Sequence, residues 1–361
     1  MTASSKNRTR ARSRGPHRPR APEHVTKVVL DMDTGVDDAF ALVLAMNSPE
    51  LEVVAVTTVA GNAPVGECTR NCLLLLELLA ARAQVAGRRG ARAAAPTAPA
   101  PIVARGAAAP LKKPLLTAPE VHGPDGLGGE IGSLPKPITK PSPLPAHEVL
   151  TSLARKHTGE LTLIATGPLT NVATALERDR GAMALYRRIV VMGGAFFVPG
   201  NTGPVAEFNF YVDPEAADAV MRSGLDITLV PLDATTRAPL MRQSLPPAAR
   251  EPWPGDARPG RDLSVILHRA LDHYMRYQLG ESGLDGGHMH DPLTVAAAID
   301  PDIITTSPGR VELVLRGEDR GRTILYEAPR DTRSPRVVFD ASDDALPALL
   351  ASRVFAPLFS G

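Results

Sequence analysis

The residues best suited to chemistry are four aspartates that lie within eight positions of one another: Asp31, Asp33, Asp37 and Asp38. Carboxylates packed this closely repel one another unless a cation, a proton or strong hydrogen-bond donors lie among them. Acidic residues favour the first turn of a helix, which would explain Asp37 and Asp38. It would not explain Asp31 and Asp33, which stand at the end of an apolar run. The spacing therefore predicts a functional site.

A second polar cluster lies far along the chain in GGHMHDP, which contains His288, His290 and Asp291. Two histidines and an aspartate could bind zinc, but a third nitrogen or sulfur ligand is not visible nearby in the sequence. The aspartates instead supply hard oxygen ligands, which suit calcium or magnesium. Asp291 before Pro292 is also typical of a helix N-cap followed by proline. Capping and metal ligation both stay open for Asp291.

These clusters need elements that position them, and apolar runs alternate with helical patterns along the chain. This alternation predicts one α/β domain over residues 25–361, with a mainly parallel, Rossmann-like central sheet flanked by helices. Strands are expected at 27–32, 51–57, 161–165, 189–192 and 226–231, and helices at 37–46, 67–82, 146–157, 168–178, 213–223, 263–277 and 291–299. From Val311, three short apolar runs predict a small antiparallel addition before a C-terminal helix.

Polar residues collect just after the expected strands. Asn62 follows the second strand, Thr166 follows the third, and Met192 ends the fourth. The loop after the fourth strand, GNTGPVAEFNF, carries Asn201, Glu207 and Asn209. Open α/β sheets bind ligands at the carboxyl ends of their strands, so we expect these residues and the aspartates around one crevice. A single asparagine in such a position is more often a turn residue than a ligand. The prediction of a site therefore rests on several polar residues meeting at one edge of the sheet.

Composition narrows the function classes. The 361 residues are 43% hydrophobic and 22% charged, as in a soluble globular protein. Aromatic residues make up only 4%, which argues against a stacking platform for nucleic acid. No apolar run is long enough to span a membrane. Two cysteines, Cys68 and Cys72, are interpreted as buried thiols in a reducing cytoplasm and not as half of a metal site.

Three segments interrupt the pattern. Residues 1–24 hold seven basic residues against the single acid Glu23, and we expect a disordered basic tail that is neither a secretory signal nor a nucleic-acid or membrane anchor. Residues 81–101, rich in Ala, Arg, Gly and Pro, predict a flexible insertion. Residues 241–261, with the only tryptophan, Trp253, predict a Pro-rich surface loop.

Together these segments resemble the inosine-uridine preferring nucleoside hydrolases. The resemblance covers most of residues 27–345 and rests on DMDTGVDD, VAGN, ATGPLTNVA, VMGG, GNTGPVAEFN with DPEAA, and the late HDP, in this order. The chain departs from the family in Thr34, where proline is usual, and in the 81–101 insertion. That proline supplies no side-chain ligand, so Thr34 should leave ligation unchanged. The insertion should affect a local lid or the contacts between subunits more than it affects the chemistry.

The resemblance implies calcium-dependent hydrolysis of the N-glycosidic bond of ribonucleosides, purine or pyrimidine, to ribose and free base. A Ca²⁺ ion would bind the attacking water and both ribose hydroxyls. Its implied ligands are Asp33, Asp38, Asp291 and the backbone carbonyl of Thr166. Asp37 is the expected general base, and His290 would assist departure of the base. The expected substrate-binding set is Asn62, His122, Met192, Asn201, Glu207 and Asn209.

Further implications concern the surroundings of this site. His122 lies in VHGPDGLGG, where it could also be an ordinary histidine of a surface loop. Tyr274, Tyr277 or His288 could line the base pocket, and Asp31 could support the metal from behind its ligands. The resemblance also implies a homo-oligomer, a dimer or a tetramer. The small-molecule ribonucleoside is the expected partner.

Two other interpretations compete with this one. VVLDMD also looks like a haloacid dehalogenase-type phosphohydrolase, in which Asp31 would be the nucleophile and Asp33 the acid/base. That class expects Thr or Val two positions after the second aspartate, where this chain has Gly35, and it gives Asp37 and Asp38 no role. A non-catalytic ribose- or calcium-binding protein on the same scaffold is the other alternative, although every expected catalytic position is filled.

Overall fold

The computed structural model describes residues 25–88, 99–129, 134–203, 205–237, 239–251, 262–328 and 333–359. The basic tail lies outside these residues, as do residues 89–98 of the predicted 81–101 insertion and Trp253. Helix α2, Val65–Arg88, extends past the predicted end of that helix, so the first part of the expected insertion is helical. Among the described residues, no helix is long and apolar enough to cross a membrane.

Nine of the described strands form one sheet, in the order β10-β9-β11-β6-β5-β4-β1-β2-β3. The strands are β1 Thr26–Met32, β2 Leu51–Thr58, β3 Ile102–Arg105, β4 Leu161–Ala165, β5 Arg188–Met192, β6 Ile227–Val230, β9 Ile304–Leu313, β10 Thr323–Glu327 and β11 Arg336–Ala341. From β3 to β11 every neighbouring pair is parallel. The mainly parallel sheet is therefore confirmed.

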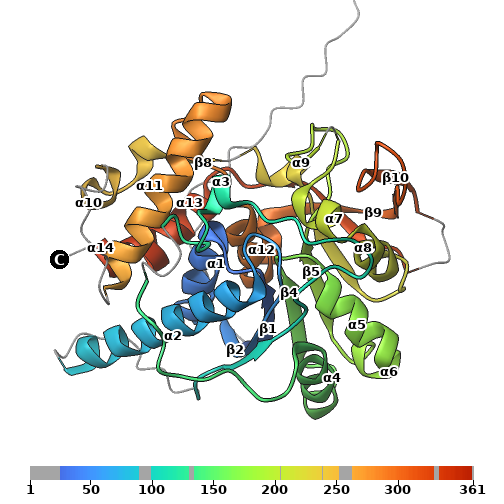
Figure 1. Ribbon diagram of the computed structural model, residues 1–361, viewed down its shortest axis with the longest axis horizontal. Coiled ribbons are helices and arrows are strands. Elements are labelled where there is room, and N and C mark those ends of the chain that lie inside the picture. Colours follow the sequence, from blue (N-terminus) through green and yellow to red (C-terminus); the bar gives the residue numbers. More distant parts are fainter. Residues whose placement is uncertain are drawn as a thin grey trace, which may run out of the picture.

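The late antiparallel addition is also present, but it continues the main sheet. β9 pairs antiparallel with both β11 and β10, whereas β11 pairs parallel with β6. Figure 1 shows β9 and β10 at one side of the molecule, beyond β5. Strand β3 was not predicted, because its apolar residues follow directly on the low-complexity segment.

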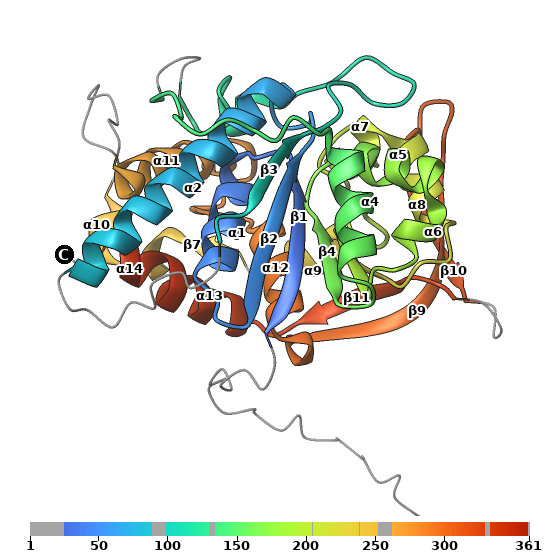
Figure 2. The same cartoon turned by 90° about the horizontal axis from the view of Figure 1, so that it is seen from below.

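Helices cover both faces of the sheet. They are α1 Val36–Met46, α2, α3 Pro119–His122, α4 Ala146–Lys156, α5 Thr170–Arg178, α6 Arg180–Met183, α7 Phe208–Val212, α8 Pro214–Met221, α9 Leu232–Thr235, α10 Pro247–Arg250, α11 Leu263–Ser282, α12 His290–Ile299, α13 Ala345–Leu350 and α14 Ala356–Phe359. Strand β1 shows why there are two layers: Val28 and Leu30 pack into one apolar cluster with α1, α11 and α12, and Val29 packs into another with α4, α5 and α8. Figure 2 shows the sheet between these layers.

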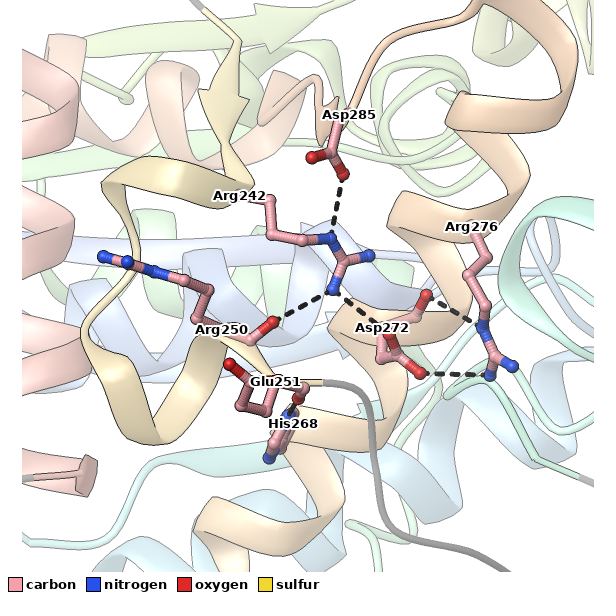
Figure 3. A network of polar contacts seen from close by, with 7 residues as sticks. All are labelled: Arg242, Arg250, Glu251, His268, Asp272, Arg276 and Asp285. Carbon is pink, nitrogen blue, oxygen red and sulfur yellow. Dashed lines mark hydrogen bonds and ion pairs between the residues drawn. The ribbon is translucent and has the colours of Figure 1, made fainter.

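The start of the predicted Pro-rich loop is ordered by an ionic network. Residues Leu240–Met241 form β7, which pairs with β8 at Gly286–Gly287, and the short helix α10 follows. Arg242 contacts Asp285 at 2.9 Å and the buried Asp272 of α11 at 3.3 Å (Figure 3). Arg276 contacts the second oxygen of Asp272. The network holds this segment against α11, so residues 241–250 of the predicted surface loop contain short ordered elements.

Candidate active site

The aspartates lie where β1 turns into α1 at the carboxyl edge of the sheet. Gly35 is the N-cap of α1, and its backbone N–H donates to Asp38 Oδ2 at 2.8 Å. A side chain at Gly35 does not fit, because its Cβ would lie 2.6 Å from Asn62 Nδ2 and 2.7 Å from His122 Nδ1. The turn thus brings Asn62, which follows β2, and His122 of α3 into contact with the first turn of α1.

Three buried carboxylates meet at this turn. Ligand oxygens of Asp37, Asp38 and Asp291 lie within 4.8 Å of one another, so the three residues could hold a metal ion. Asp291 comes from the first turn of α12, which packs against α1. Asp38 also accepts hydrogen bonds from Asn62 Nδ2 at 3.1 Å and from the Thr166 hydroxyl at 2.7 Å. The fold therefore joins the early aspartates to the late HDP segment, as the sequence predicts.

Asp291 does not cap its helix. Helix α12 begins at His290, and Met289 occupies the N-cap position without a side-chain cap. The predicted capping role is therefore wrong, and the carboxylate of Asp291 is left to face Asp37. By contrast, Asp213 caps α8, because its Oδ1 accepts from Ala216 N and Pro214 follows it.

Asp33 lies beside the three clustered carboxylates. Its Oδ2 accepts from the backbone N–H of Asn62 at 2.6 Å, whereas its Oδ1 is buried and has no hydrogen-bond partner among the described residues. A buried carboxylate oxygen without a partner is costly, and a cation would satisfy it. This orphan oxygen and the all-oxygen donor set fit a hard cation such as calcium.

Burial and mutual repulsion shift the acids toward their protonated forms. Burial, and then the charge of Asp38, raises the pKa of Asp37 to about 7. Burial raises the pKa of Asp33 and Asp291 well above the usual range, with Asp38 adding to the first and Asp37 to the second. A bound cation would reverse these shifts, because an opposite charge favours the carboxylate.

Asp31 is held inside the fold by hydrogen bonds from neighbouring elements. It is fully buried, and its Oδ1 accepts from Thr57 Oγ1 at 2.5 Å and from Asn171 Nδ2 at 2.8 Å. Asn171 also donates to the carbonyl of Thr58 at 3.0 Å, so it joins α5 to the ends of β1 and β2. A phosphohydrolase would need Asp31 exposed to substrate, and this geometry excludes that interpretation. Sequence reasoning assigned no role to Thr57 or Asn171.

The residues expected to bind ribose differ in what they contact. Asn209 is buried, and its Nδ2 donates to the Thr166 carbonyl at 2.7 Å and contacts Met192 Sδ at 3.4 Å. Glu207 is buried at the N-terminus of α7, where its carboxylate accepts from three backbone N–H groups. Asn201 is exposed, and its Oδ1 accepts from Phe208 N. The structure brings Asn209 and Met192 together with Thr166 and gives Asn201 a loop-holding contact instead.

Two histidines approach the carboxylates from other elements. His122 ends α3, is buried, and stacks on Tyr274 of α11 with ring centroids 5.9 Å apart. Burial, and then the charges of Asp37 and Asp291, raise the pKa of Tyr274 well above its usual range. Burial, and then a neighbouring histidine, lowers the pKa of both His122 and His290 to about 3. Both rings are therefore neutral at physiological pH, and His122 is not a surface-loop histidine.

Residues 28–346 match the sequence model described as the inosine-uridine preferring nucleoside hydrolases. The chain belongs to this family. Among curated relatives of this nucleoside hydrolase, the pyrimidine-specific ribonucleoside hydrolase RihA of Klebsiella pneumoniae is 39% identical over 91% of this chain and 97% of its own. Uridine nucleosidase 1 of Arabidopsis thaliana is 37% identical over 83% of this chain and 81% of its own.

Solved structures agree with this assignment. A plant nucleoside hydrolase, the PpNRh1 enzyme, superposes with a TM-score of 0.77 at 32% identity, over 92% of this chain and 99% of its own. A purine-preferring ribonucleoside hydrolase from Gardnerella vaginalis superposes with a TM-score of 0.79 at 27% identity, over 93% and 100%. The resemblance read from the motifs and the prediction of an N-glycosyl hydrolase are therefore confirmed.

Substituting Gly61 should disturb the acids of this nucleoside hydrolase although it replaces none of them. A Cβ at Gly61 would overlap Asp33 Oδ2 and lie 2.8 Å from Pro168 Cδ. We expect Gly61→Ala to displace Asp33 and to lower the free energy of unfolding by about 1–3 kcal/mol, because the packed site must shift. Gly66→Ala is the matched control, since nothing lies within 4 Å of that Cβ. Urea unfolding of both variants checks this; equal stability would contradict it.

Proposed function

We propose that this nucleoside hydrolase cleaves the N-glycosidic bond of pyrimidine ribonucleosides with the help of a bound calcium ion. The observation that carries the proposal is the meeting of Asp37, Asp38 and Asp291 at the carboxyl edge of the sheet, beside two neutral histidines. The preference for pyrimidines is supported by the names of the curated relatives at 39% and 37% identity.

An all-oxygen donor set suits a hard cation, calcium or magnesium, and the family resemblance favours calcium of the two. Its proposed ligands are Asp33, Asp38, Asp291 and the Thr166 carbonyl. That carbonyl already accepts from Asn209, but a carbonyl oxygen has a second lone pair for a cation. When bound, the ion would supply positive charge that orients the attacking water and the 2′- and 3′-hydroxyls of ribose.

Asp37 is the proposed general base. It lies in the first turn of α1 between Asp38 and Asp291, and it is 4% exposed, so water has limited access. Its carboxylate would take a proton from the water while the water oxygen bonds to the anomeric carbon. The electrons of the broken C–N bond leave with the nucleobase, which gains a proton. The products are ribose and free base.

The remaining residues hold the sugar and the base. Asn62 and Asn209 are the ribose contacts with the best support, because each already contacts a proposed metal ligand. Met192 lies against Asn209, where it can pack beneath the sugar. Carbonyl and carboxylate oxygens directed at the ribose stabilise the positive charge that develops in the transition state more than neutral ribose. Asn201 and Glu207 belong to the proposal on the motif alone, and His122 and His290 would face the base.

We infer that the protein works in the cytoplasm as a homo-oligomer, a dimer or a tetramer. The cytoplasm is supported by Cys68 and Cys72, which are buried and unpaired with each other. The oligomer is supported by the family resemblance. Light scattering of the purified chain tests the second inference, and a monomer at micromolar concentration would contradict it.

A nucleoside panel tests the proposed substrate class. Uridine and cytidine should be hydrolysed with the highest kcat/KM, and inosine should be slower. We expect 2′-deoxyuridine to be at least about 100-fold slower than uridine, because it lacks a hydroxyl that the ion is proposed to bind. Free base and reducing sugar are the two readouts. Equal rates for uridine and 2′-deoxyuridine would contradict the metal role, and faster cleavage of inosine would contradict the pyrimidine preference.

A further inference from the structure

The ring of His290 is held by a residue that no motif singles out. Thr235 ends the short helix α9, directly after β6, and its hydroxyl lies 2.7 Å from His290 Nδ1. Helix α9 packs against α12, whose first residue is His290. The contact therefore joins two elements that are 55 residues apart in sequence.

The direction of this hydrogen bond follows from burial. Thr235 is only 2% exposed, and among the described residues His290 Nδ1 is the one hydrogen-bond partner of its hydroxyl. If Nδ1 carried a proton and donated it, the hydroxyl proton would be left buried without an acceptor, which folded proteins rarely tolerate. The hydroxyl therefore donates, Nδ1 accepts, and the ring proton must reside on Nε2.

His122 shows the same arrangement on a different element. Its Nδ1 lies 3.1 Å from the backbone nitrogen of Val36, and a backbone N–H can only donate. Its proton is therefore also on Nε2. Two histidines from α3 and α12 thus have Nδ1 occupied by a protein donor and Nε2–H left to act as a donor.

We propose that Thr235 is a positioning residue that fixes His290 in the Nε2–H form, so that this histidine donates a hydrogen bond to an acceptor atom of the departing base. The inference rests on the proposed function for the identity of the substrate. When the C–N bond breaks, its electrons raise the negative charge on the base heteroatoms, so a fixed donor stabilises the transition state more than the ground state. A pyrimidine carbonyl oxygen is such an acceptor.

Leaving-group dependence tests this role in the full chain. We expect Thr235→Val to lower kcat/KM for uridine by about 10- to 100-fold, because a ring free to change tautomer loses its donor part of the time. Hydrolysis of 4-nitrophenyl riboside should change less than about twofold, since nitrophenolate departs without such help. Thr235→Ser should restore uridine hydrolysis. Thr236→Val is the matched control, because its hydroxyl donates only to Leu232 O of its own helix.

A spectroscopic measurement determines the tautomer in the wild-type protein itself. In protein labelled with ¹⁵N-histidine, two-bond ¹H–¹⁵N correlations should show a protonated Nε2 and an unprotonated Nδ1 for His290, assigned by its loss in His290→Gln. A protonated Nδ1 in the wild-type protein would overturn the inference, as would an equal loss of both substrates in Thr235→Val. Failure of the wild type to cleave any riboside would instead overturn the proposed function, and the tautomer would still be measured.

Discussion

Asp291→Asn should lower kcat/KM for uridine by at least about 10³-fold while leaving the calcium-free protein as stable as the wild type, or more stable. The loss of activity follows from removing a charged oxygen from the proposed calcium site. The retained stability follows from the pKa of Asp291, which burial and the charge of Asp37 raise well above its usual range. Because its pKa is raised, the calcium-free fold favours the neutral form of this side chain, and asparagine is neutral and nearly the same shape.

Thermal unfolding with and without calcium separates these effects. The wild type should gain melting temperature on addition of calcium, and Asp291→Asn should gain little, because only the native site binds the ion. Asp272→Asn is the matched control, since both aspartates are 3% exposed. Asp272 contacts Arg242 and Arg276, so its loss should destabilise the fold by about 1–3 kcal/mol and keep the calcium response. A calcium response that survives in Asp291→Asn would contradict the proposed ligand set.

Asp37→Asn should lower kcat for uridine by about 10²- to 10⁴-fold with calcium still bound, whereas Asp33→Asn should weaken calcium binding. The reason is that the two residues have different proposed roles. Asp37 accepts the proton of the water, and Asp33 binds the ion through Oδ1, which has no hydrogen-bond partner among the described residues. Isothermal titration with calcium and steady-state kinetics measure the two properties separately.

In the alternative arrangement, Asp37 binds the ion and Asp33 is the general base. Asp37, and not Asp33, lies with Asp38 and Asp291 within 4.8 Å. If Asp37→Asn loses calcium and Asp33→Asn keeps it but loses turnover, the two roles must be exchanged. Equal and small effects of both substitutions on kcat would contradict a base in this cluster altogether.

The sequence predicted those parts of the fold that depend on local pattern. The apolar run before Asp31 and the acidic first turn of α1 identify a strand-to-helix turn, and the alternation of later runs identifies the sheet. The Asp213-Pro214 pair is typical of an N-cap, and Asp213 caps α8. Strand β3 and helix α7 were missed because each is short. Strand β3 depends on its pairing with β2, and α7 depends on the Glu207 carboxylate, which caps it and also accepts from the distant Gly194 N.

The parts of the site that depend on distant contacts could not be predicted. Asp291 reads as a cap in sequence, but α12 begins one residue earlier, and only the packing of α12 on α1 turns its carboxylate toward Asp37. Asn171 lies in the helix expected at 168–178 without an assigned role, yet it holds Asp31 from 140 positions away. Thr235 has no sequence signal at all, because a threonine after a strand is common and only its partner gives it a role.

The most direct test of the account is uridine hydrolysis as a function of calcium occupancy. Protein stripped by a chelator and dialysed is titrated with calcium, while bound ion is measured by calorimetry and free uracil by chromatography. Hydrolysis should fall below about 1% of the saturated rate in the stripped protein and return in proportion to the sites filled. Full activity in the stripped protein, or calcium binding without hydrolysis of any ribonucleoside, would contradict it.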